Sequence, residues 1–134
     1  MAKTPHTIAQ QSYSRCLRSP DFFERFYELL LDSHPAIAPM FAQTYFPRQR
    51  QLLKHGLGLL LSYGNKPDEA LLDRLAARHS TSALNVAPEL YASFVDSLVR
   101  VVGERDPKFD EGVEQAWREV VAPGIRYMQD RYDA

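Results

Sequence analysis

The hydrophobic residues of this chain recur with the spacing of amphipathic helices along almost its whole length. In residues 22–30, 52–61 and 113–128, apolar side chains recur three or four positions apart, so each set falls on one side of a helix. No stretch shows the alternation and hairpin turns that are typical of strands. The pattern therefore predicts an all-α fold of six to seven helices.

Prolines and glycines mark where these helices begin and end, as expected for capped helices. Ser19, Pro20 and Asp21 combine a cap, a proline and an acid, which together form a helix start signal. His34 precedes Pro35 and should end that helix, because the residue before a proline disfavours helical dihedral angles. The predicted helices cover residues 7–17, 22–34, 36–42, 46–64, 68–78, 88–102 and 113–128.

Three residues inside these helices oppose regular helix geometry. Gly56 and Gly58 each cost about 1 kcal/mol relative to alanine in a helix interior, so we expect a backbone or a ligand to approach closely there. Pro123 removes one hydrogen bond from the last helix, where we expect a kink.

Composition and charge narrow the classes of function. With 134 residues, of which 45% are hydrophobic and 25% charged, we expect one soluble domain, residues 1–134, with a substantial core. The net charge of −1 gives no electrostatic attraction to nucleic acid or to an anionic membrane surface. The longest apolar run, residues 57–61, is too short to cross a bilayer. The N-terminal residues carry no signal-peptide pattern, so a cytoplasmic location is expected.

His79 is the histidine with the most apolar surroundings. It comes at the end of the helix predicted for residues 68–78 and continues a stripe that includes Leu71, Leu72 and Leu75. A histidine in such a place is commonly a core or capping residue, since a neutral imidazole packs well and its cation favours a helix C-terminus. A histidine that faces an apolar groove between two helices is also a possible ligand of a buried metal centre. The residues alone leave both interpretations open.

The other histidines are weaker candidates. His6 lies in the polar N-terminal segment, His34 stands in a corner before proline, and His55 lies to one side of its helix's apolar stripe. A zinc site is disfavoured, because Cys16 and the four histidines show none of the short paired spacings that zinc sites prefer.

Three stretches resemble the single-domain bacterial globins, which correspond to the haem domain of flavohaemoglobins without its reductase. FYELLLDSHPAIAPMF (residues 26–41) resembles the second helix and the corner that ends in the haem-packing phenylalanine. RLAARHSTSALNVAPELY (residues 74–91) resembles the helix that ends in the iron-ligating histidine, with its loop. QAWREVVAPGIRYM (residues 115–128) resembles the tryptophan-bearing last helix. The resemblance covers nearly the whole chain and implies a globin fold around a pocket for haem b.

This resemblance assigns roles on both sides of the haem. His79 matches the ligand of the iron, which requires a neutral imidazole held in place by packing. Phe41 matches the phenylalanine that packs flat on the haem. Tyr27 matches the tyrosine that donates a hydrogen bond to bound dioxygen, whose outer atom carries partial negative charge.

The long helix at residues 46–64 admits two registers. In the preferred one Gln49 faces the ligand beside Tyr27, and Leu53 is the apolar residue one turn later. In the other, Leu52 faces the ligand and Gly56 lies over the iron.

On the histidine side, Tyr91 matches the tyrosine that supports the ligand, while Phe94 and Leu98 are expected to line the haem pocket. The candidate partners of the haem propionates are four basic residues: Arg48, Arg50, Lys54 and Arg78.

Four functions fit this chain. The first is reversible binding of dioxygen, together with nitric oxide and carbon monoxide, at the iron of a haem b protein. The second is an enzyme, a nitric oxide dioxygenase that receives electrons from a separate reductase, since no dinucleotide-binding motif is present. The third is a gas sensor that acts through a partner, and the fourth is a haem-free helical interaction module. We favour the first, although a globin pocket serves the enzyme equally well.

Overall fold

The computed structural model describes residues 3–66, 68–70, 72–73, 76 and 86–131. Six helices have defined bounds, and no strand occurs in these ranges: α1 (Pro5–Cys16), α2 (Phe22–Ser33), α3 (Ile37–Met40), α4 (Phe46–Asn65), α6 (Leu90–Arg105) and α7 (Glu111–Asp130). Residues 69–70, 72–73 and 76 are helical as well. The all-α prediction is confirmed.

Side-chain caps explain where α1 and α7 begin, and a proline explains where α2 ends. Thr4 accepts a hydrogen bond on its side-chain oxygen from the Thr7 amide at 3.1 Å, which lets α1 begin at Pro5. The Asp110 carboxylate likewise accepts from the Val113 amide at 2.8 Å at the start of α7. His34 has extended backbone angles (φ −159°, ψ 134°), so α2 ends before Pro35 as predicted.

The last two helices differ from their predicted bounds. Helix α6 begins at Leu90 rather than at Pro88, because the amides of Leu90 and Tyr91 close a turn onto the carbonyls of Ala87 and Pro88. Helix α7 continues through Pro123 as far as Asp130.

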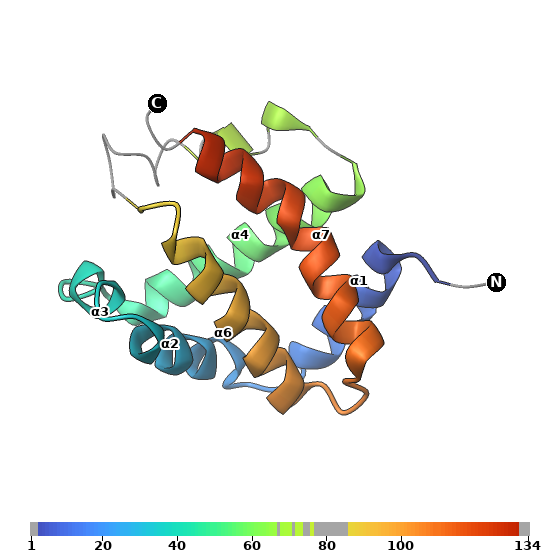
Figure 1. The fold of residues 1–134 in the computed structure, drawn as a ribbon. Coiled ribbons are helices and arrows are strands. Elements are labelled where there is room, and N and C mark those ends of the chain that lie inside the picture. Colours follow the sequence, from blue (N-terminus) through green and yellow to red (C-terminus); the bar gives the residue numbers. More distant parts are fainter. Residues whose placement is uncertain (1–2, 67, 71, 74–75, 77–85, 132–134) are drawn as a thin grey trace.

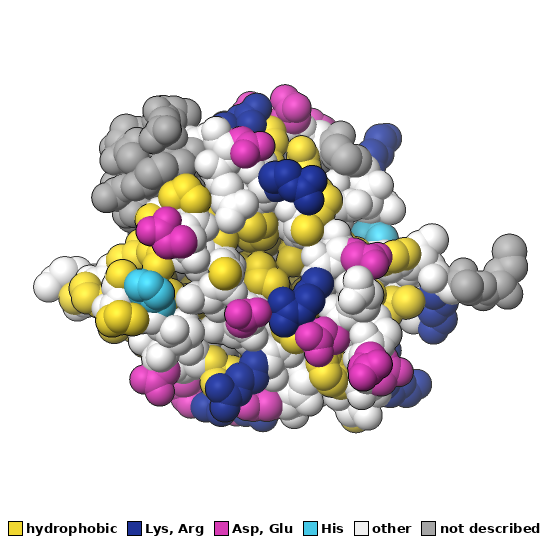
Figure 2. All heavy atoms as spheres, in the orientation of Figure 1, with side chains coloured by type: hydrophobic (Ala, Val, Ile, Leu, Met, Phe, Trp, Pro, Cys, Tyr) yellow, Lys and Arg dark blue, Asp and Glu magenta, His cyan; other side chains and the backbone are white. Residues whose placement is uncertain are grey.

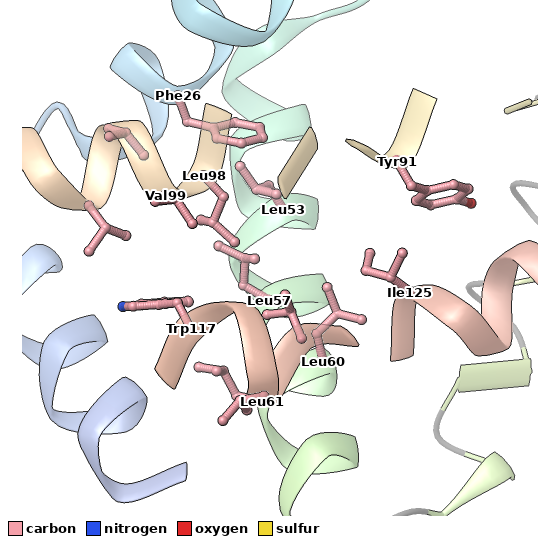
Figure 3. Close-up of a cluster of buried hydrophobic side chains, with 14 of the residues drawn as sticks. Phe26, Leu53, Leu57, Leu60, Leu61, Tyr91, Leu98, Val99, Trp117 and Ile125 are labelled. Carbon is pink, nitrogen blue, oxygen red and sulfur yellow. The ribbon is translucent and has the colours of Figure 1, made fainter. Parts of the chain in front are cut away.

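The helices form a layered arrangement in which α6 and α7 pass in front of α4 (Figure 1). Helix α7 packs most extensively on α1 and α4, while α2 packs on α6. Helix α3 lies beside α2, near the beginning of α4 (Figure 1). Figure 3 shows the core that this packing buries, where Leu57 of α4 lies close to Trp117 of α7 and Leu98 of α6. Helix α3 therefore lies at one end of the molecule, away from the crossing of α4 and α7 (Figure 1).

Two glycines let α4 and α7 approach closely. A Cβ atom on Gly64 would lie 2.1 Å from the Val120 carbonyl oxygen, and one on Gly124 would lie 2.5 Å from Cδ2 of Leu60. The described chain shows no close backbone approach at Gly56 or Gly58, since none of its atoms lies within 4 Å of a Cβ at either position. The close approach occurs instead at the end of α4. The other alternative, the approach of a ligand at Gly56 and Gly58, stays a prediction.

No helix in the described ranges combines the length and the hydrophobicity that crossing a membrane requires.

Candidate functional site

Three aromatic rings from three elements meet at the end of the molecule near α3. The centroid of the Tyr27 ring in α2 lies 5.6 Å from that of Phe41, which follows α3, and 5.4 Å from that of Phe46, which begins α4. Phe41 and Phe46 are stacked, with their centroids 6.1 Å apart. Tyr27 is buried, whereas both phenylalanines are half-buried. The rings together form an aromatic wall that is partly open to solvent.

A single polar pair interrupts this wall. The Gln49 side-chain amide donates a hydrogen bond to the Tyr27 hydroxyl oxygen at 3.1 Å. Among the described residues no acceptor is found for the proton of that hydroxyl. Burial raises the pKa of Tyr27, and the hydrogen bond from Gln49 opposes the rise only in part. At neutral pH the hydroxyl therefore stays protonated and can donate a hydrogen bond to a bound ligand.

Helix α4 turns one face toward this pair. Leu53 is one turn beyond Gln49 and is 8% exposed, while Gly56 follows at seven positions, on the same side of the helix. The half-buried Gly56 has open space at its Cβ position as far as the described atoms show. Gln49 thus lies beside Tyr27, while Leu52 is half-buried; which of the two faces a ligand stays a prediction.

Helix α6 contributes the remaining predicted pocket residues. Leu98 is fully buried, and Phe94 is half-buried with its ring centroid 5.4 Å from that of Phe26. Phe26 in turn lies 5.2 Å from Tyr27, so Phe94 is linked to the aromatic wall through one ring. Tyr91 is 4% exposed, and burial raises the pKa of its hydroxyl to about 12.

The predicted iron ligand, His79, lies outside the described residues, and so does Arg78. Two of the other histidines lie outside the aromatic wall. Nδ1 of His34 accepts a hydrogen bond from the Ala36 amide at 3.0 Å, and His55 is exposed. Within the described ranges no group of three or more histidine, cysteine or acidic side chains could hold a bare metal ion.

The basic candidates for the propionates are at the surface. Arg48 and Lys54 are exposed, and Arg50 is half-buried, with its guanidinium 4.0 Å from a carboxylate oxygen of Glu24.

These observations fit a flat, apolar group such as haem. Figure 2 shows hydrophobic side chains gathered at the left of the molecule, over α3, and Met40 in this helix is 38% exposed. An aromatic, partly open wall with one oriented polar pair suits an apolar macrocycle that carries a small polar ligand.

Phe46 belongs to this site, yet the sequence predicted it only as a helix start. Its position three residues before Gln49 places both on one side of α4, and this spacing is the signal that could have found it.

Comparisons with known proteins agree with this geometry. A family model, Globin, matches residues 24–125. A crystal structure from Pseudomonas aeruginosa PAO1, of a protein described as structurally highly homologous to a human haemoglobin, superposes with a TM-score of 0.95. The two chains are 36% identical, and the match covers 98% of this chain and 100% of the other. No match was found among curated proteins.

Proposed function

Because this chain belongs to the globin family, whose members bind haem, we propose that it holds haem b through His79 and binds dioxygen reversibly. The haem would supply an iron that binds diatomic gases. Carbon monoxide and nitric oxide are expected to bind the same iron. The histidine ligand, the haem type and a cytoplasmic location stay predictions.

Each predicted pocket residue has a separate proposed role. Phe41 would pack against the flat face of the haem, while Leu53, Phe94 and Leu98 would exclude water from it. Tyr27 would donate a hydrogen bond to a gas ligand that carries partial negative charge, and Gln49 would keep the hydroxyl in place. Tyr91 would support the imidazole from the side of α6.

The hydrogen bond between Gln49 and Tyr27 is the observation that carries this proposal. Because the amide donates to the hydroxyl oxygen, the hydroxyl's own proton remains for an acceptor outside the described residues. A bound ligand with partial negative charge would be such an acceptor, and a hydrogen bond to it would stabilise the bound state.

The direct test compares two histidine variants for haem content. His79→Ala should lose most of the Soret absorbance per mole of protein, whereas His55→Ala, which changes an exposed histidine, should keep it. Added imidazole should restore a five-coordinate ferrous spectrum in His79→Gly. A full Soret band in His79→Ala would show that another residue holds the iron, and a parent chain that takes up no haem would overturn the proposal.

The described contacts serve a gas carrier and a nitric oxide dioxygenase equally well. The enzyme, its separate reductase and a sensor that acts through a partner therefore remain predictions from sequence.

A further inference from the structure

Two side chains near the end of α7 hold two segments that are distant from each other in the sequence. The Tyr127 hydroxyl donates a hydrogen bond to the Asp73 carboxylate. The Gln129 side-chain amide donates a hydrogen bond to the Pro88 carbonyl at 3.1 Å. His79 lies between Asp73 and Pro88 in the sequence. One short stretch of α7 is thus bonded to the chain on both sides of this histidine.

The two donors leave α7 on opposite sides. Residues two positions apart on an α-helix are related by a rotation of about 200° about its axis, so their side chains point to nearly opposite sides. Tyr127 faces α4, since its ring centroid lies 5.6 Å from that of Tyr63. Gln129 instead reaches the turn that precedes α6. The last turns of α7 therefore lie between Asp73 and Pro88 and set the separation of these two points.

Arg131, which directly follows α7, strengthens the attachment at Tyr127. The guanidinium carbon of Arg131 lies 3.6 Å from the Tyr127 ring centroid, a cation–π geometry. Its Nη2 atom lies 3.9 Å from a carboxylate oxygen of Glu69, one turn before Asp73. The hydrogen bond to Asp73, together with burial, raises the pKa of Tyr127 to about 12, so the hydroxyl remains a donor at neutral pH.

We propose that Tyr127 and Gln129 are positioning residues for the iron ligand: by holding Asp73 and Pro88 on opposite sides of α7, they fix how His79 meets the haem. The orientation of a ligating imidazole depends on residues that do not touch the metal, and their loss weakens metal affinity. This inference rests on the proposed function, because the separation of Asp73 and Pro88 matters only if His79, which lies between them in the sequence, is the iron ligand.

The test replaces each donor with a side chain of similar shape. Tyr127→Phe and Gln129→Met remove one hydrogen bond each. Gln115→Met is the matched control, since its amide donates only to Glu119 on the same exposed face of α7, at 3.0 Å. In the ferrous protein the iron–histidine stretching band, measured by resonance Raman spectroscopy, should shift in both variants and stay in place in the control. Haem transfer to an excess of apomyoglobin should be roughly 2- to 10-fold faster in each variant, as expected for one net hydrogen bond.

Hydrogen exchange on the haem-free protein supplies a second readout. Tyr127→Phe should speed amide exchange around Asp73, Gln129→Met should speed it around Pro88, and the control should change neither. An unshifted stretching band in both variants would overturn the proposal even if exchange increased, because the bonds would then be structural only. If the parent chain takes up no haem, the proposed function fails together with this inference. If the parent binds haem but the band does not shift in either variant, only this inference fails.

Discussion

Tyr27 and Gln49 are 22 positions apart, and their contact exists because α2 and α4 meet at that point. The resemblance to bacterial globins supplied both residues, but periodicity alone could not choose between Gln49 and Leu52, which lie on neighbouring faces of one helix. The contact between Tyr127 and Asp73 escaped prediction because its two residues come from different elements, and no local pattern marks such a pair. Phe46 was missed as well, although its spacing from Gln49 was a local signal.

The Tyr27 hydroxyl should discriminate between gases. Bound dioxygen carries more negative charge on its outer atom than carbon monoxide does, so Tyr27→Phe should mainly affect dioxygen. A hydrogen bond to a charged partner contributes about 1.5–3 kcal/mol, which corresponds to roughly 10- to 100-fold faster dioxygen dissociation in stopped-flow experiments. Carbon monoxide dissociation should change far less. Tyr13→Phe serves as the control, because its hydroxyl donates a long 3.4 Å bond to the Lys54 carbonyl and its ring packs on Phe22 and Trp117 rather than on the aromatic wall. Unchanged dioxygen dissociation would mean that the Tyr27 hydroxyl is structural.

At the scale of helices, turn and cap residues predicted most of the architecture. Helices α2 and α4 end at His34 and Lys66, which have extended backbone angles and precede prolines in the sequence, so both ends follow from a local dihedral preference. The role of a glycine is not a local property in this sense, because it depends on which other helix crosses at that point. The sequence suggested a close approach at Gly56 and Gly58, but the backbone of α7 approaches Gly64. Nothing within α4 itself distinguishes these three glycines.

Two alanine substitutions in α4 should therefore have opposite effects on stability. Gly58→Ala adds a methyl group that meets no described atom within 4 Å, so the higher helix propensity of alanine should stabilise the fold by up to about 1 kcal/mol. In Gly64→Ala the new Cβ would meet the Val120 carbonyl oxygen at 2.1 Å. Because that atom belongs to a helix backbone, α4 and α7 must separate, at a cost of about 1–3 kcal/mol. Urea denaturation of the two variants measures both changes. Equal stability of the two would contradict the close crossing at Gly64.

At the scale of the whole molecule, one buried carboxylate joins three helices. The Asp106 side chain is fully buried and accepts hydrogen bonds from Ser12 at 2.6 Å and from two nitrogens of Arg15 at 2.6 and 2.8 Å. Ser12 in turn accepts from the indole of Trp117 at 2.9 Å. The sequence predicted Asp106 only as a break before Pro107, since its partners on α1 lie more than 90 positions away. This hydrogen-bond network thus joins α1 to the end of α6 and to α7, and no local sequence pattern reveals it.

This network should make the fold sensitive to acid. Burial raises the pKa of Asp106, but the hydrogen bonds from Arg15, Ser12 and the Lys108 amide outweigh burial and leave the pKa below its usual value. An unfolded aspartate has a pKa of about 3.9, so the stabilising contribution is complete above that pH. It is lost as the pH falls below that value and through the lower pKa of the folded state.

Asp106→Asn removes this charge and supplies the last test. The variant should lose about 1.5–3 kcal/mol of stability at pH 7, because charge-assisted hydrogen bonds are replaced by weaker neutral ones. Its unfolding free energy should also depend less on pH below about pH 4, where the parent loses the contribution of the carboxylate. Asp96→Asn is the control: this side chain is 69% exposed and pairs with Arg118 at 3.1 Å, so its removal should cost between about 0 and 1 kcal/mol. Urea titrations from pH 2.5 to 7 measure both effects. If the two variants showed the same loss at pH 7 and the same acid profile, Asp106 would behave as a surface carboxylate, and the three helices would be held by apolar packing alone.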